Sequence, residues 1–315
     1  MSAQPVTLWH RLEYVFMRVL FAVGFRLSYR RRLGLVGWLN AQVLCPLAGL
    51  RPKMRRNLRH AFPDMPGTEM RRLLRAVPDS MARTMMEIFS GEEFRAIATT
   101  AEITGAEGMA ALDAAHRDGR AVILVSGHFG NYDVPRAVFL GRGFRMGGLY
   151  RPMDNPLFNE TYVAAIKAIG EPLFPRSRRG MAEMVRFLRS GGMIGLLIDQ
   201  RHKQGAPLDF FGREALTPLS AAEMAMKYDA LLVPVYGVRH ADGMHFDLVV
   251  EPPIPHGSAE EMTQALNDSL EAQIRKHPEQ WLWMHDRWGL RHAEKRAEKK
   301  VRKRKVKRRR SKDAG

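Results

Sequence analysis

The middle of the chain alternates between short apolar runs and longer stretches with helical periodicity. The apolar runs predict strands at Ala121–Ser126, Phe144–Tyr150, Met193–Asp199, Leu231–Val238 and His245–Glu251. Helical patterns cover Glu107–Arg117, Asn131–Leu140, Leu157–Ile169, Gly180–Arg189, Pro218–Tyr228 and Ala259–Lys276. Apolar strands that alternate with helices are typical of a largely parallel sheet covered on both faces. Asp242-Gly243 indicates a hairpin between the last two strands. We therefore expect an α/β fold with a mixed, largely parallel sheet flanked by helices.

The first fifty residues are apolar but carry several arginines. Leu8–Leu27 is apolar on most sides, and its arginines fall within one stripe of a helix. A second apolar run follows at Leu33–Leu50. Two buried helices of a soluble domain would fit this pattern. Arginines beside long apolar stretches, with Trp9 and Trp38 near their ends, favour helices at a membrane interface. We expect residues 1–50 to form a membrane-associating helical segment, monotopic or single-pass.

The rest of the chain divides into one domain and a tail. Residues 51–290 are expected to form the domain, which begins with helices at Arg51–His60 and Glu69–Phe89. Thr68 is the expected N-cap of the second helix. Residues 291–315 form a charge run with almost no apolar side chains, so we expect them to be disordered or helical only on binding.

The net charge of +17 is concentrated at the two ends of the chain. Residues 1–60 contain eleven Lys or Arg and one acid, and residues 291–312 contain fourteen and two. The middle is therefore slightly acidic. Basic termini attract polyanions, and both anionic lipid and nucleic acid qualify. The single cysteine, Cys45, excludes an internal disulfide framework and a Cys-rich metal site.

A histidine stands directly after the predicted strand Ala121–Ser126, in the glycine-containing segment Gly127–Asp133. Open α/β sheets bind ligands at the carboxyl ends of their strands. The two glycines of the segment permit a tight turn. Such a turn would let the Asp133 carboxylate contact the His128 imidazole, fix its tautomer and stabilise the imidazolium.

The chemistry expected of this pair is general acid–base catalysis. Neutral imidazole has an unperturbed pKa close to physiological pH, which suits a base that removes a proton from a hydroxyl. A structural His–Asp pair would have the same spacing. The sequence contains no Gly-x-Ser-x-Gly elbow, which favours direct transfer without a covalent intermediate. No cluster of His, Cys and carboxylates has ligand spacing, so we expect no metal and no bound cofactor.

Ser126–Asp133 resembles the His-x4-Asp/Glu block of the late acyltransferases of lipid A biosynthesis, which are relatives of the glycerolipid acyltransferases. Further segments resemble the same family in the same order: Arg55–Leu58 before Phe62-Pro63, Tyr150–Pro156, Asp199-Gln200 with Phe210–Gly212, Leu231–Pro234 with Arg239, and Pro278–Trp288. The resemblance identifies residues 51–290 as an acyltransferase domain with a glycerolipid-acyltransferase-like fold.

This resemblance implies a reaction and a set of residues. A fatty acyl chain would pass from acyl carrier protein, or from a coenzyme A thioester, to a hydroxyl of a lipid A precursor, an acylated and Kdo-bearing glucosamine disaccharide. The family's catalytic dyad corresponds to His128 and Asp133. Substrate binding would fall to further residues: Arg151, Asp199, Gln200 and Arg239. The expected partners are acyl carrier protein, the lipid A precursor and an anionic membrane surface, at the cytoplasmic face of the inner membrane.

Two alternatives remain from the sequence. The same dyad would serve an acyltransferase that acts on another phospholipid or glycolipid, such as a glycosylated phosphoinositide. The basic tail would also suit a nucleic-acid-binding protein, but it lacks interleaved aromatic residues, so we expect no specific nucleic-acid partner. Arg239 and Arg287 would equally fit structural ion pairs.

Overall fold

The computed structural model describes residues 6–290, so the expectation for residues 291–315 lies outside the described residues. The helices are α1 (Leu8–Gly24), α2 (Tyr29–Leu39), α3 (Cys45–Leu47), α4 (Leu50–Ala61), α5 (Gly67–Phe89), α6 (Glu92–Ala98), α7 (Ala106–Arg117), α8 (Val134–Gly141), α9 (Pro156–Ile169), α10 (Arg178–Arg189), α11 (Ser220–Lys227) and α12 (Ala259–Lys276). A π-helical turn, Asn40–Leu44, joins α2 to α3, and a 3-10 turn, Pro278–Gln280, follows α12.

The strands are β1 (Glu102–Thr104), β2 (Val122–Ser126), β3 (Met146–Tyr150), β4 (Leu173–Pro175), β5 (Met193–Leu197), β6 (Ala206–Asp209), β7 (Glu214–Thr217), β8 (Leu231–Arg239) and β9 (Phe246–Val250). Within residues 6–290, seven of them form one sheet in the order β1-β9-β8-β2-β5-β3-β4. All of its neighbouring pairs are parallel except β8 with β9. The expected mixed, largely parallel sheet is therefore confirmed. The strands β6 and β7 form a separate antiparallel hairpin.

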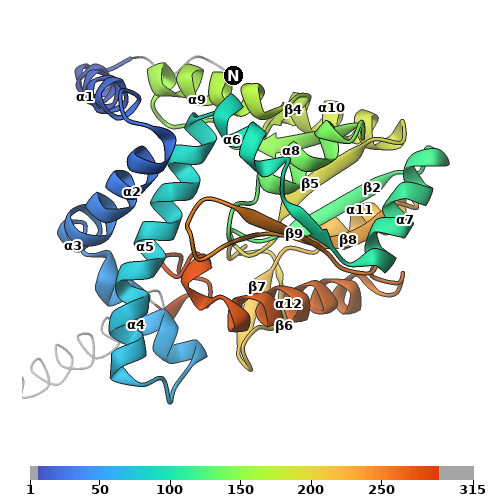
Figure 1. The fold of residues 1–315 in the computed structure, drawn as a ribbon. Helices are drawn as coiled ribbons and strands as arrows, with labels where there is room; N and C mark the ends of the chain where they lie inside the picture. The colour runs from blue at the N-terminus through green and yellow to red at the C-terminus, as the bar shows by residue number, and fades with distance from the viewer. Residues whose placement is uncertain (1–5, 291–315) are drawn as a thin grey trace, which may run out of the picture.

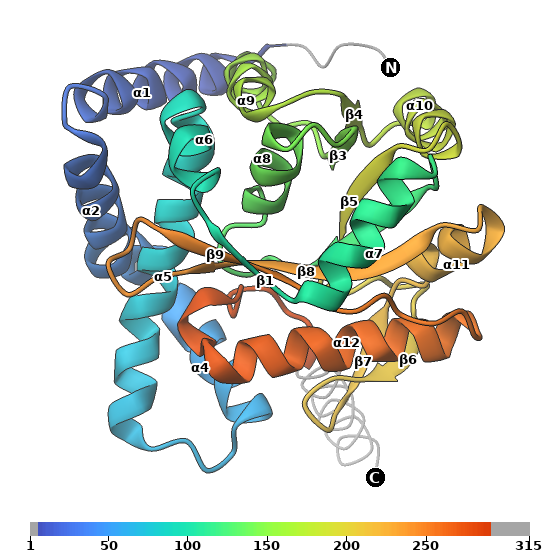
Figure 2. The same ribbon diagram turned by 45° about the vertical axis from the view of Figure 1, so that its right-hand side comes forward.

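Helices cover both faces of the sheet (Figure 2), and every residue of the central strand β2 is therefore buried. Val122 and Leu124 pack into a core shared with α6, α7, α8 and α9. Ile123 and Val125 pack into a second core shared with α10, α11 and α12. Alternate side chains of a strand point to opposite faces, so one apolar run supplies both cores.

A third core closes the carboxyl ends of β2 and β8. Leu58 of α4 and Leu73 of α5 pack there with Phe129, which follows β2, and with Trp283 near the end of the domain. Figure 1 shows α4 and α5 at this end of the sheet. The expected N-cap at Thr68 is wrong. The helix α5 begins at Gly67, so Thr68 lies inside it and the N-cap is Pro66.

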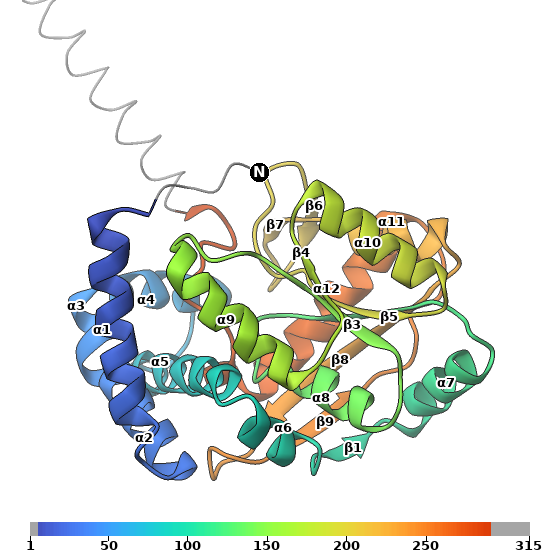
Figure 3. The same ribbon diagram turned by 90° about the horizontal axis from the view of Figure 1, so that it is seen from above.

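The N-terminal helices pack on the domain with one face and leave the other exposed. Phe21 of α1 stacks on Phe158 of α9, with 6.1 Å between ring centroids, and also contacts Phe89 of α5. Figure 3 shows α1 beside α9, and α2 beside α5 on the side away from the sheet. The opposite face of α1 is a stripe of exposed apolar side chains, here called the α1 apolar stripe: Leu8, Leu12, Val15, Val19 and Val23.

In residues 6–290 no individual helix has the length and apolar character of a membrane span. Tyr29–Leu47 and Leu50–Ala61 pass that test only when taken together, and they meet at a bend of 95°.

Candidate active site

Two glycines shape the loop that carries His128. A Cβ on Gly127 would lie 2.9 Å from the Leu270 side chain and 3.2 Å from an Asp199 carboxylate oxygen. Gly130 has a φ of +54°, and a Cβ there would lie 2.0 Å from the Gly237 carbonyl oxygen. Gly127 therefore permits a close approach that a side chain would block, and Gly130 requires both that close approach and the backbone freedom of glycine.

The imidazole of His128 pairs with Asp199. Asp199 follows β5, and β5 lies parallel to β2, so both residues reach the same edge of the sheet. His128 Nδ1 lies 2.8 Å from Asp199 Oδ1. The other oxygen, Oδ2, accepts hydrogen bonds from the His128 backbone N–H at 2.8 Å and from the Trp281 indole N–H at 2.9 Å. The carboxylate is thus fixed from three sides, and His128 Nε2 is left for chemistry.

The expected contact between His128 and Asp133 is corrected by the structure. Within residues 6–290 no hydrogen bond or ion pair joins the two side chains. Asp133 instead pairs with Arg136, one helical turn further on, at 2.8 Å. The reason is local geometry: the Asp133 backbone N–H bonds to the Asn131 side chain, and α8 begins directly afterwards. The Asp133 carboxylate is therefore held against the first turn of α8, where it contacts Arg136.

Burial and pairing act in opposite directions on the two groups. Burial alone lowers the pKa of His128, but the charge of Asp199 and its hydrogen bond raise that pKa above the ordinary 6.5. Burial alone would raise the pKa of Asp199, but His128 and the Trp281 N–H hold it down, at about 2. The pair is therefore a carboxylate next to an imidazole that binds a proton more tightly than free histidine.

The Nε2 atom of His128 faces Gln200. Gln200 Nε2 lies 3.3 Å from His128 Nε2, and the Gln200 side chain is exposed. The next backbone N–H, that of Arg201, donates to His285 Nε2 at 3.0 Å. His285 thus holds the turn that presents Gln200. Trp281 and His285 both lie in the segment Pro278–Trp288, but sequence alone assigned no role to either one.

Within residues 6–290, none of the other predicted residues forms a hydrogen bond with His128 Nε2. Arg151 is 68% exposed and pairs with Asp154. Arg239 is buried and pairs with Glu87, which favours the structural alternative over a contact with substrate. Asp199 contacts the imidazole of His128 directly, at Nδ1. Arg287 is also structural, since it is fully buried and donates to the Leu216 carbonyl.

A narrow pocket lies at the carboxyl ends of β2, β3 and β5. Its volume is about 90 Å³, and most of its walls are apolar. Ser126 and Leu197, the last residues of β2 and β5, line it together with Tyr132, which follows His128 in the loop. The Tyr132 and His128 ring centroids are 5.6 Å apart, so the pocket lies beside the His–Asp pair.

Fold and site together define a class: an α/β protein with a His–Asp pair at the carboxyl edge of a largely parallel sheet, next to an apolar pocket, an arrangement typical of enzymes. Comparison with known proteins is more specific. Residues 5–289 match the family described as bacterial lipid A biosynthesis acyltransferase. The chain therefore belongs to this family and is an acyltransferase.

Individual relatives are similar at modest identity. The chain is 24% identical to a lipid A biosynthesis acyltransferase of Haemophilus influenzae, over 87% of this chain and 85% of the relative. It is 28% identical to the lipid A biosynthesis lauroyltransferase of Escherichia coli, over 75% and 78%. A phosphatidylinositol mannoside acyltransferase of Mycobacterium tuberculosis is 23% identical over 58% of each chain.

Proposed function

We propose that this protein transfers a fatty acyl chain from a thioester to a hydroxyl of a lipid A precursor, with His128 as general base. The observation that carries the proposal is the His128–Asp199 pair, which holds Nδ1 in place and leaves Nε2 facing an exposed side chain. Family membership supports acyl transfer as the reaction. The His128–Asp199 pair supports His128 as the base in that reaction.

The proposed reaction proceeds without an acyl-enzyme. His128 Nε2 removes the proton of the acceptor hydroxyl while that oxygen attacks the thioester carbonyl carbon. The carbon–sulfur bond then breaks, and the imidazolium returns the proton to the departing thiolate. Asp199 accepts a hydrogen bond from Nδ1–H throughout and stabilises the imidazolium. Asp133 has no role as the partner of His128 in this scheme.

We assign the pocket beside Tyr132 to the acyl chain. Apolar walls favour hydrocarbon by removing it from water. The Asp133–Arg136 pair lies at the same pocket. Because these two charges neutralise each other, they limit the electrostatic cost of placing an apolar chain beside them.

The names of the relatives point to two classes of acceptor. Relatives named for lipid A biosynthesis and a relative named phosphatidylinositol mannoside acyltransferase are each matched over more than three quarters of their length. The phosphatidylinositol mannoside acyltransferases support a glycosylated phosphoinositide as the second candidate. The family match favours the lipid A precursor.

We further propose that the enzyme acts at an anionic membrane surface, with acyl carrier protein or coenzyme A carrying the acyl chain. The α1 apolar stripe is exposed, with side-chain exposures from 56% at Val23 to 74% at Leu8. Large apolar side chains on one face of a helix bind the boundary between headgroups and acyl chains. No metal or cofactor takes part in the scheme, and activity in the presence of a chelator is expected to be unchanged.

Mass spectrometry of cellular lipids tests the proposal. Cells that lack this protein should contain lipid A with one secondary acyl chain missing, and the intact gene should restore that chain, whereas a His128→Ala gene should not. Unchanged lipid A together with an acyl-deficient glycosylated phosphoinositide would support the second candidate. Unchanged lipids of both kinds would contradict the proposal.

A further inference from the structure

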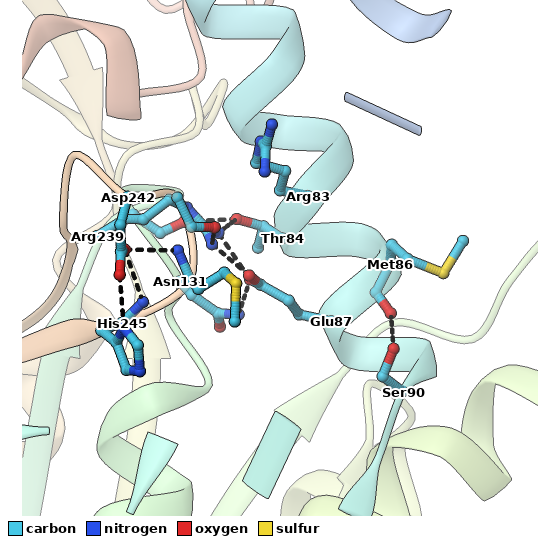
Figure 4. Close-up of polar contacts among 12 residues, drawn as sticks. Arg83, Thr84, Met86, Glu87, Ser90, Asn131, Arg239, Asp242 and His245 are labelled. Carbon is cyan, nitrogen blue, oxygen red and sulfur yellow. Dashed lines mark hydrogen bonds and ion pairs between the residues drawn. The ribbon is translucent and has the colours of Figure 1, made fainter. Parts of the chain in front are cut away.

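A buried polar cluster lies between α5 and the end of β8, behind the His128 loop (Figure 4). Glu87 of α5 is fully buried, and Arg239 of β8 is 7% exposed. The two form an ion pair, in which Arg239 Nη2 lies 2.6 Å from Glu87 Oε2. The same Nη2 donates to Thr84 Oγ1 at 2.9 Å. The proposed reaction uses none of these three residues.

The cluster is joined directly to the loop. The Asn131 side-chain amide donates to Glu87 Oε2 at 2.8 Å, and the Thr84 hydroxyl donates to the Gly130 carbonyl at 2.8 Å. Both contacts fall on consecutive residues, two and three positions after His128. One helix of the structure thus holds the loop through a side chain and through its backbone.

The remaining backbone groups of these two residues are also paired. The Gly130 N–H donates to the Gln280 carbonyl at 2.9 Å, and the Asn131 N–H donates to the Gly237 carbonyl at 3.0 Å. Gln280 in turn bonds through its side-chain amide to both the N–H and the carbonyl of Arg239. The loop is therefore held by three segments that are far apart in the sequence.

Stability alone is a weak reason for such a pair. Removing two charges from water costs free energy, and well-packed apolar residues often replace a buried pair without loss of stability. Charged groups can do something that apolar residues cannot: they form several directional hydrogen bonds, which fix the orientation of their partners. Here the partners are Gly130 and Asn131, which follow the proposed base.

We infer that Glu87, Arg239 and Thr84 are positioning residues that set the His128 loop relative to Asp199. They act through Gly130 and Asn131 and do not touch the substrate. The inference rests on the proposed role of His128 as general base. A loop that shifts by a fraction of an ångström would keep the fold and lose the alignment of Nε2 with the acceptor.

Thr84 offers the sharpest test, because its hydroxyl can be removed at nearly constant shape. We expect Thr84→Val to lower kcat by roughly ten- to a hundred-fold, with KM changed little. Thr84→Ser, which keeps the hydroxyl, should retain most of the turnover. Thr263→Val is the matched control: Thr263 is equally buried, but its hydroxyl bonds only to Ala259 of its own helix, so turnover should stay at the wild-type level.

The pH profile separates positioning from packing. A loosened loop weakens the contact with Asp199, so the pKa of His128 falls and the acid limb of kcat/KM moves to lower pH in Thr84→Val. The neighbouring titratable groups, His285 and Arg287, are not substituted in this variant. A Thr84→Val enzyme with wild-type kcat and an unmoved acid limb would overturn the inference.

The ion pair is tested by the double substitution Glu87→Leu/Arg239→Met. We expect it to keep a melting temperature near that of the wild type while kcat falls at least ten-fold. Wild-type kcat in this variant would contradict a positioning role, and if it fails to fold, the Thr84 series decides alone. The parallel His128→Ala assay distinguishes the two failures: an active His128→Ala enzyme defeats the proposed function, whereas an inactive one with unaffected Thr84→Val defeats only this inference.

Discussion

The loop after β2 and the N-terminal helix α1 are built in opposite ways. In the loop, Phe129 and Asn131 are completely buried, and the polar groups bond to residues as distant as Gln280. In α1, the polar groups bond mostly within the helix, and the α1 apolar stripe faces outward. The loop depends on the whole domain for its shape, whereas α1 depends mainly on its own turns.

This contrast predicts that substitutions in the two regions have different effects. A substitution in the loop or its supports should alter the chemistry, because the position of His128 is set by long-range contacts. A substitution on the α1 apolar stripe should alter where the enzyme works and leave the chemistry intact. Substitutions in the two regions test that division.

Removal of the base should have the largest effect. His128→Ala is expected to lower kcat by roughly 10²–10⁴-fold, the usual contribution of general acid–base catalysis. Steady-state assays with a thioester donor and detergent-dispersed acceptor measure this. Near wild-type turnover would show that the pair is structural.

The two carboxylates near His128 should differ. Asp199→Asn is expected to lower kcat by roughly 10²-fold or more, because the imidazole loses the group that fixes its tautomer. Asp133→Asn should cost much less turnover and act mainly on stability, since the buried Arg136 loses its charged partner. A larger loss of kcat in Asp133→Asn than in Asp199→Asn would support Asp133 as the carboxylate partner of His128 in catalysis.

The raised pKa of His128 predicts the pH dependence. The neutral base is the active form, so kcat/KM should fall as pH drops through a pKa above 6.5. For stability the sign is opposite: the contribution of the protonated pair is complete below the unfolded-state pKa and is lost as pH rises through the folded-state pKa. A kcat/KM acid limb below pH 6.5 would contradict the assignment.

Trp281→Phe should give a moderate effect. It keeps the ring but removes one of the two donors to Asp199 Oδ2. A hydrogen bond to a charged group is worth about 1.5–3 kcal/mol, so we expect kcat to fall by roughly ten-fold, with little change in KM. Trp283→Phe is the control, because its indole N–H donates to the Pro278 carbonyl, away from the pair. Equal losses in both variants would point to packing instead.

The α1 apolar stripe should have the smallest effect on the chemistry. Val15→Ser/Val19→Ser is expected to weaken binding to anionic phospholipid vesicles by roughly ten-fold, since two exposed apolar side chains no longer enter the membrane. Turnover in detergent should stay within about two-fold. Met226→Ser, which removes an exposed apolar side chain from α11, should change neither. Unaltered vesicle binding in the α1 variant would contradict its role.

The sequence predicted most of the sheet because strands such as β2 and β8 are near-continuous apolar runs. Strands such as Glu102–Thr104 and Leu173–Pro175 were missed, because three residues carry no readable period. The position of His128 at a strand end could also be predicted. Its partner could not: Asp133 is five residues away in the chain, and Asp199 is nearer in space only because β2 and β5 are neighbours. The order of strands in a sheet cannot be read from the local pattern of apolar and polar residues.

The indole of Trp281 also bears on how the enzyme comes into being. When residue 277 has been synthesised, the nine strands described in residues 6–290 and α12 are already present in the chain. Trp281 is still missing at that point. Asp199 Oδ2 therefore lacks one of its two hydrogen-bond donors, and Phe129 lacks its β-bridge to Trp281. Because translation proceeds from the N-terminus, the sheet can form while the site is still incomplete. Competence for acyl transfer therefore arrives only with the last dozen residues of the domain, after the surface that would meet the membrane has emerged.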